Sequence, residues 1–352
     1  MANILDIRRR IRSVTNTRQI TKAMKVVSAA KLRRAQDRAL AARPYAEMLT
    51  NVLKSLVSRA EILDPETGEP RHPLVAQREE RRVLLVIVTG DKGLAGAFNT
   101  NILKAAMHFL ESKAGQNVEI EAIGRKGRDF MRRRFPKAQA RVRTGEREAS
   151  SASSVTIVGE QVGVLNKLDY SVAAEIAERV IERYRNGDID SVYLLFNEFK
   201  SVMVQRLVVE QILPVGHIGW TVVSQAAEMT KEEKAKARKA AVAAGVGLRA
   251  ADTSQIDAEA AKFATAKVDY IYEQSPTELF NSLLPKYVGV QIFRALLESI
   301  AAEHAARMTA MDAATNNASE MIDSLTLAMN RARQAKITKE IIEIVGGAAA
   351  AV

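Results

Sequence analysis

The sequence predicts an α/β protein in which two long helices, one from each end of the chain, flank a small doubly wound α/β domain. Three observations predict this architecture. Apolar residues at both ends recur at alternating spacings of three and four, with almost no glycine or proline. The middle of the 352-residue chain alternates β-branched runs with amphipathic stretches. Only 5% of the residues are aromatic and alanine is abundant, a composition that favours helices over a β-sandwich.

The first unit, residues 1–58, is predicted to be one long helix with a single apolar seam. Before residue 43, eleven lysines and arginines stand against two aspartates, so most of the net charge of +11 lies in this helix. A charge run is usually a solvated helix face. The sharper interpretation is a basic rod held inside an acidic partner. We expect the seam to contain Ile4, Ile7, Ile11, Val14, Ile20, Met24 and Val27.

The second unit, residues 59–221, is predicted to be the α/β domain. A loop with three prolines and a glycine, residues 59–81, leads into a continuous β-branched run that ends at Gly90, which is typical of a buried strand. A serine-rich loop is expected at 148–154. The expected strands are 82–90, 118–124, 191–196 and 206–214, and the expected helices are 99–113, 125–135 and 168–186.

The third unit, residues 222–268, is rich in alanine and charges and poor in large apolar groups. We expect a helical surface insertion of one or two exposed helices, broken at Gly245 and Gly247 and dispensable for assembly.

The fourth unit, residues 269–352, carries the second long helix, which the chain enters from Pro276. A helix of about sixty residues is about 90 Å long, so it needs a partner helix along its length, which the first unit supplies. Its predicted seam is Met308, Met311, Thr315, Ala318, Ile322, Leu325, Met329 and Ala332.

Several classes of function are excluded by composition. The chain has no cysteine, which excludes disulfides and thiol catalysis. Its four histidines are far apart in sequence and show no metal-ligand spacing. No apolar run reaches the length of a membrane span, and the N-terminus shows no signal-peptide core.

Two alternative functions start from particular residues. The turn GDKGLAG follows a strand and precedes a helix, where phosphate loops sit, and it would suit a nucleotide-binding enzyme. Its spacing is not that of a phosphate loop, so a tight structural turn is favoured. The basic first helix would also suit a coiled-coil protein that binds nucleic acid. No aromatic residue is interleaved with its arginines, however, and its apolar seam must pack on something.

Three separated stretches resemble, in the same order, the γ-subunit family of F-type ATP synthases. They are RIRSVTNTRQITKAMKVVSAAKLRRAQ near the N-terminus, TGDKGLAGAFN after the first strand and ITKEIIEIVGGAAA near the C-terminus. The segment EHAARMTAMDAATNNA, residues 303–318, is similar to the terminal helix of that family.

The resemblance implies an antiparallel coiled coil with a Rossmann-like α/β domain at its foot. It implies a non-catalytic rotor shaft that couples rotation of a proton-driven membrane ring to conformational cycling of the catalytic β subunits. The implied partners are three α and three β subunits, the ε subunit and the membrane c-ring, without nucleic acid, cofactor or metal. The implied location is peripheral, on the cytoplasmic face of a bacterial inner membrane, without direct membrane insertion.

The resemblance also implies two sets of contact residues. The membrane-ring contact would be formed by Tyr270, Tyr272 and Glu273. For the β-subunit contact we expect Met24 to face the turn that contains Arg333 and Thr338 across the coiled coil. The full β-subunit set is Met24, Lys25, Arg333, Gln334, Thr338, Glu340 and Glu343.

The chain departs from the family pattern at two places. Ala95 stands in the glycine turn where the family often has cysteine. The insertion 222–268 lies where the chloroplast form carries a redox-regulatory segment, but without cysteine, so thiol control of rotation is not supported.

Overall fold

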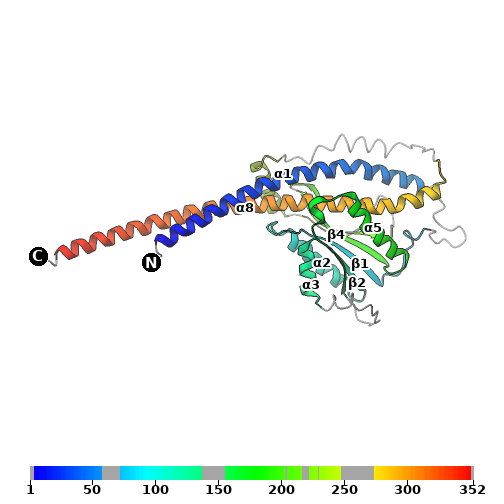
Figure 1. The fold of residues 1–352 in the computed structure, drawn as a ribbon, viewed down its shortest axis with the longest axis horizontal. Helices are drawn as coiled ribbons and strands as arrows, with labels where there is room; N and C mark the ends of the chain where they lie inside the picture. The colour runs from blue at the N-terminus through cyan, green and yellow to red at the C-terminus, as the bar shows by residue number, and fades with distance from the viewer. Residues whose placement is uncertain are drawn as a thin grey trace.

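Two long helices form an antiparallel coiled coil along one side of an α/β domain in the computed structural model (Figure 1). The structure describes residues 4–57, 72–136, 155–202, 204–215, 222–228, 230–246 and 273–349. Helix α1 spans Ile4–Val57 and helix α8 spans Pro276–Ala349. With 54 and 74 residues they are about 80 and 110 Å long at 1.5 Å per residue. The predicted helical seam of α8 is confirmed, since every one of its members is buried or half-buried.

Polar contacts fix the register between the two helices. The Thr315 hydroxyl donates to the Thr21 hydroxyl at 2.8 Å, and Lys25 Nζ lies 2.8 Å from Asp312 Oδ1. Met24 is therefore level with residues near Asp312, and its expected placement opposite the Arg333–Thr338 turn is wrong. Because the helices are antiparallel, extending this pairing to the start of α1 places Ile4 opposite Arg333. Helix α8 therefore continues past the start of α1 for about 24 Å.

The seam of α1 also differs from the predicted one. Ile4, Ile7, Ile11 and Val14 face α8 as expected, but Ile20 and Val27 are 60% and 55% exposed. Strict alternation of three and four continues instead through polar residues, which are buried or half-buried: Arg18, Thr21, Lys25 and Ser28. Along α1 the seam is thus apolar near the N-terminus, polar in the middle and apolar again from Leu32 towards the domain, which is the lower part of the coiled coil.

Cysteine pairs can test this register, because the chain has no cysteine of its own. Thr21→Cys with Thr315→Cys is expected to form a disulfide on mild oxidation, because the two hydroxyls are already in contact. Met24→Cys with Arg333→Cys is the matched control and should stay reduced. The readout is mobility on a non-reducing gel. Cross-linking of the control pair alone would contradict the register.

The domain is built on a six-stranded sheet of order β3-β2-β1-β4-β5-β6. The first four of these strands in space pair in parallel, and β5 and β6 are added antiparallel. The central strand is fully buried from Val83 to Val88, as its β-branched sequence predicts. The strands span Arg82–Val88 (β1), Asn117–Ile123 (β2), Val155–Gln161 (β3), Ser191–Ser201 (β4), Val204–Leu213 (β5) and Val222–Glu228 (β6).

Helices cover both faces of the sheet, and β1 divides its side chains between them. Leu84, Val86 and Val88 join the core under α5 (Tyr170–Arg185) and α8. The C-terminal end of α1 contributes to the same core. The intervening residues of β1 join a second core under α2 (Phe98–Ser112). Helix α3 (Arg125–Arg134) lies beside α2, and a short 3₁₀ helix, η1 (Val164–Lys167), precedes α5 (Figure 1).

The expected helical insertion 222–268 needs correction in two respects. Residues 222–228 form strand β6, which pairs with β5, so the helical part starts later, at α6 (Lys231–Ala243). Helix α6 is also not simply exposed. Ala237, Ala240 and Ala241 are buried in the second core against α8. Small alanine side chains allow close helix packing, so this composition here reflects a contact rather than a solvated helix. Residues 247–268 lie outside the described residues.

Candidate functional site: the projecting helix end and the glycine turn

The end of α8 projects alone beyond α1 (Figure 1). Every described side chain from Arg333 to Val345 is exposed. Its ion pairs are local ones along the helix, Lys336 with Glu340 at 3.6 Å and Lys339 with Glu343 at 3.5 Å. The Thr338 hydroxyl donates to the carbonyl of Gln334. Such exposed pairs contribute little stability. The polar groups of this stretch are therefore available to a partner.

The same stretch exposes large apolar side chains. Ile341, Ile342, Ile344 and Val345 are between 54% and 72% exposed. A contiguous exposed apolar surface on a folded chain usually marks an interaction site. On the projecting end, these apolar side chains lie among the predicted β-subunit contact residues Arg333, Gln334, Thr338, Glu340 and Glu343, which are all exposed.

The other predicted contact residues do not join this cluster. Met24 is half-buried about 30 Å lower along the coiled coil, at 1.5 Å per residue. The Lys25 side chain is only 13% exposed and is bound to Asp312. Sequence reasoning missed this role of Asp312. The signal was present, because Lys25 falls in phase with the seam positions Ile4 and Thr21.

Of the predicted membrane-ring residues, the structure describes Glu273, which lies at the end of α8 opposite to the projecting stretch. Glu273 is exposed and lies three residues before Pro276, where α8 begins. Tyr270 and Tyr272 lie outside the described residues.

The glycine turn after β1 is held against α8. An added Cβ at Gly90 would lie 2.7 Å from Glu303 Oε1, and Arg307 donates to the Gly93 carbonyl at 3.4 Å. The Gly90 N–H donates to Asn99 Oδ1. With this strand order, nucleotides bind at the carboxyl ends of the strands, between β1 and β4. Here α8 runs across that crevice, and Gly90 allows its close approach. The structural-turn interpretation of GDKGLAG is favoured.

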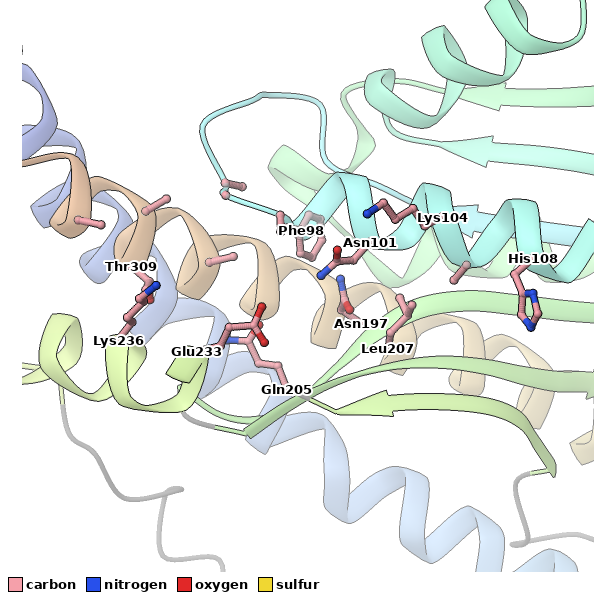
Figure 2. A pocket seen from close by; sticks show the side chains of 17 residues that line it. Phe98, Asn101, Lys104, His108, Asn197, Gln205, Leu207, Glu233, Lys236 and Thr309 are labelled. Carbon is pink, nitrogen blue, oxygen red and sulfur yellow. The ribbon is translucent and has the colours of Figure 1, made fainter. Parts of the chain in front are cut away.

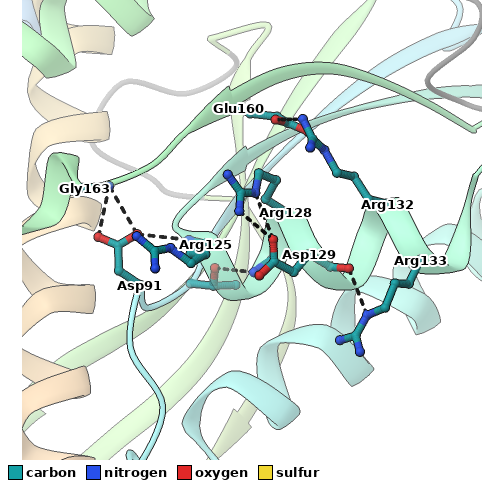
Figure 3. Close-up of polar contacts among 10 residues, drawn as sticks. Asp91, Arg125, Arg128, Asp129, Arg132, Arg133, Glu160 and Gly163 are labelled. Carbon is teal, nitrogen blue, oxygen red and sulfur yellow. Dashed lines mark hydrogen bonds and ion pairs between the residues drawn. The ribbon is translucent and has the colours of Figure 1, made fainter.

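The N-terminus of α3, a second place where a phosphate could bind, is occupied by a side chain of the protein itself (Figure 3). The Asp91 carboxylate accepts the backbone N–H of Arg125, at the start of α3, and the N–H of Gly163. Helix N-termini attract anions, and an internal carboxylate takes that place here. The arginines of α3 also bind acidic neighbours, Arg128 with Asp129 and Arg132 with Glu160.

A groove lies between α2, α6, α8 and the sheet (Figure 2). Its volume is about 660 Å³ and much of its wall is alanine. Lys104 and His108 from α2 lie apart from Glu233 and Lys236 of α6, so no acid–base pair converges in it. Among the described residues there is also no group of acidic or histidine side chains that could hold a metal, and no helix long and apolar enough to span a membrane.

The comparisons with known proteins agree over the whole chain. The family model described as "ATP synthase" matches residues 3–351. A curated ATP synthase gamma chain from Solibacter usitatus is 49% identical over 351 residues and covers 100% of both chains. Another, from Geobacter sp. (strain M21), is 42% identical and covers 99% of this chain and 98% of its own. The chain belongs to the ATP synthase γ-chain family.

A solved structure has a similar fold. A chain in the Euglena gracilis mitochondrial ATP synthase structure, whose title names OSCP, F1 and c-ring, aligns with a TM-score of 0.56 at 18% identity. The alignment covers 99% of this chain and 94% of that one. As a γ chain, the protein is a non-catalytic subunit of the synthase and its central rotor shaft. The nucleic-acid alternative is replaced by this assignment.

Proposed function

We propose that this γ chain couples a proton-driven c-ring to the catalytic β subunits through its two ends. The observation that carries the proposal is the projecting stretch of α8, residues 333–345, which is exposed and partly apolar. It would occupy the centre of a ring of three α and three β subunits. The ε subunit would bind beside the foot, and the whole assembly would lie peripherally on the cytoplasmic face of a bacterial inner membrane.

The mechanism follows from asymmetry rather than from bond chemistry. A rod with a different surface on each side contacts each β subunit differently, and it stabilises the conformation with which its contacts are best. Such differential affinity is what shifts a conformational equilibrium. Rotation of the rod then takes each β subunit through all of the conformations in turn.

The contacts are proposed at two levels of the shaft. The upper level contains Arg333, Gln334, Thr338, Glu340 and Glu343, whose charged groups can form charge-assisted hydrogen bonds to β subunits. The lower level contains Met24 with the exposed basic face of α1, which is complementary to acidic β-subunit loops. Lys25 would contribute through Asp312, by fixing the helix that presents Met24.

The upper level can be tested in the reconstituted assembly of α, β and γ chains. Arg333→Ala, Gln334→Ala and Thr338→Ala together are expected to lower γ-dependent ATPase activity at least about tenfold, because several charge-assisted bonds are lost. Lys336→Ala with Lys339→Ala is the matched control on the same exposed stretch and should retain activity. Equal losses in both variants would contradict the assignment of specific contacts.

The foot is proposed to hold the c-ring through Tyr270, Tyr272 and Glu273. Changing all three to alanine should leave soluble ATPase activity near normal and should lower ion pumping by reconstituted membranes, since the shaft would turn with a weaker hold on the ring. Pumping per ATP and thermal stability are the two measurements. Collapse of stability with normal pumping per ATP would assign the residues to the domain core instead.

A further inference from the structure

A second, smaller pocket lies where the coiled coil meets the glycine turn. Its volume is about 300 Å³, and its walls come from α1, the turn after β1, η1 and α8. It opens beside the carboxyl end of β1, the side of the sheet on which this strand order binds ligands. Although α8 covers the nucleotide crevice itself, this neighbouring space remains open.

Positive side chains dominate the pocket. Lys31 and Arg34 lie on one face of α1, three residues apart, and Lys92 comes from the glycine turn. All three are exposed, and within the described chain none of them forms an ion pair. Arg38 also lines the pocket, but its guanidinium donates to the Leu168 carbonyl. Three lysine and arginine side chains are thus free to bind an anion.

The two carboxylates of the pocket, Asp91 and Glu303, offset only part of its positive charge, because five lysines and arginines line the same space. Asp91 accepts the N–H groups of Arg125 and Gly163 and the Asn166 amide. Glu303 forms a buried ion pair with Arg307. Neither acid forms a described ion pair with Lys31, Arg34 or Lys92, and the charged side chains of the pocket leave a positive excess.

Positive side chains also lie at the deeper wall of the pocket. His304 lines the pocket beside Arg307, with His304 Nδ1 3.4 Å from Arg307 Nη1. Burial, then Arg307 and Lys31, lower the pKa of His304 to about 4. The ring is therefore neutral at physiological pH and adds no charge to the pocket. The excess of lysine and arginine side chains that line the pocket is what attracts an anion.

We propose that this pocket binds an oxyanion of the phosphate class between Lys31, Arg34 and Lys92. The source is inorganic phosphate or the terminal phosphate of a nucleotide. The volume favours the free ion, because base and ribose would have to remain outside the pocket. Bound phosphate would connect α1 to the glycine turn, and so would stiffen the junction between the shaft and the domain that turns with it.

The test is a calorimetric titration of the full-length chain with inorganic phosphate at fixed ionic strength. We expect saturable binding of one ion per chain, weakened at least tenfold by Lys31→Ala, Arg34→Ala and Lys92→Ala together. Arg8→Ala, Arg9→Ala and Arg10→Ala is the matched control, since it removes the same charge from exposed positions of α1 far from the pocket. This control should bind phosphate as the unchanged chain does.

Two results would overturn the proposal: no saturable binding to the unchanged chain, or equal weakening in both variants, which would indicate attraction by net charge alone. A parallel titration with ADP separates the sources. Affinity similar to that of phosphate would identify the free ion, whereas ADP binding at least tenfold tighter, and lost in the same pocket variant, would identify a nucleotide phosphate. Because the isolated chain is used, the result is independent of rotary coupling.

Discussion

Replacing Asp312 by alanine is expected to destabilise the γ chain by about 3 kcal/mol, because it leaves the Lys25 ammonium without its partner inside the coiled coil. The two side chains are only 13% and 12% exposed and lie 2.8 Å apart. An unpaired charge in such a place must either be dehydrated without compensation or separate the helices to reach water. Urea unfolding followed by circular dichroism measures the loss.

The matched control removes both charges. Lys25→Met with Asp312→Leu should recover most of the stability lost in the single variant, because apolar pairs of similar volume often replace buried ion pairs without cost. The double variant should also show weaker preference for the native register, since one of the two polar contacts that fix it is gone. A double variant as unstable as Asp312→Ala would contradict the ion-pair explanation.

Replacing Gly124 by alanine is expected to destabilise the domain by about 3 to 5 kcal/mol. Its φ of +97° lies where L side chains are strained, and an added Cβ would lie 1.9 Å from the Thr89 carbonyl oxygen. That oxygen belongs to the junction where β1 leaves the sheet, and the Thr89 hydroxyl accepts the N–H of Gly127 there. The backbone must therefore shift at the junction.

Gly115→Ala separates backbone strain from the collision. Gly115 has a similar φ of +107° but no atom within 4 Å of an added Cβ. Its substitution should cost only about 1 to 2 kcal/mol of left-handed strain. Thermal unfolding of the two variants gives the comparison. Equal losses would show that strain alone, and not contact with Thr89, accounts for the effect at Gly124.

The long helices could be predicted because their apolar residues repeat with one dominant period, and the central strand because it is a continuous β-branched run. The register could not, because an apolar seam that repeats every seven residues offers the same contacts after a shift of one heptad. Two polar contacts distinguish one register from the others, Thr21 with Thr315 and Lys25 with Asp312. In the sequence alone, each of these side chains looks like an ordinary surface residue. Ile20 and Val27 were assigned to the seam because they are apolar, although the spacing favours their polar neighbours.

Two strands were missed for physical reasons. Strand β3 is at the sheet edge, is mostly half-buried and contains Gly159, so its sequence VTIVGEQ carries only a weak strand signal. Strand β6, with the sequence VVSQAAE, lies at the other edge and has the composition of the insertion that follows it. Edge strands need less apolar sequence than central ones, because they are less enclosed.

The contact residues at the end of α8 were predicted from the resemblance and stay a prediction, and the structure places these side chains together on an exposed stretch. Met24 belongs to a different level because register, not sequence similarity, decides which residues of two helices are neighbours. Glu303 and Arg307 were not predicted as a unit. Their roles depend on the approach of α8 to Gly90, which only the fold reveals.

The most direct measurement of the rotor assignment is rotation itself. Because the chain has no cysteine, His108→Cys gives a single exposed labelling site on α2. A bead attached there, on an assembly whose β subunits are fixed to glass, should turn continuously in one direction when ATP is supplied and should stop when ATP is removed. ATP hydrolysis by such an assembly with only Brownian motion of the bead would contradict the assignment of this chain as the shaft.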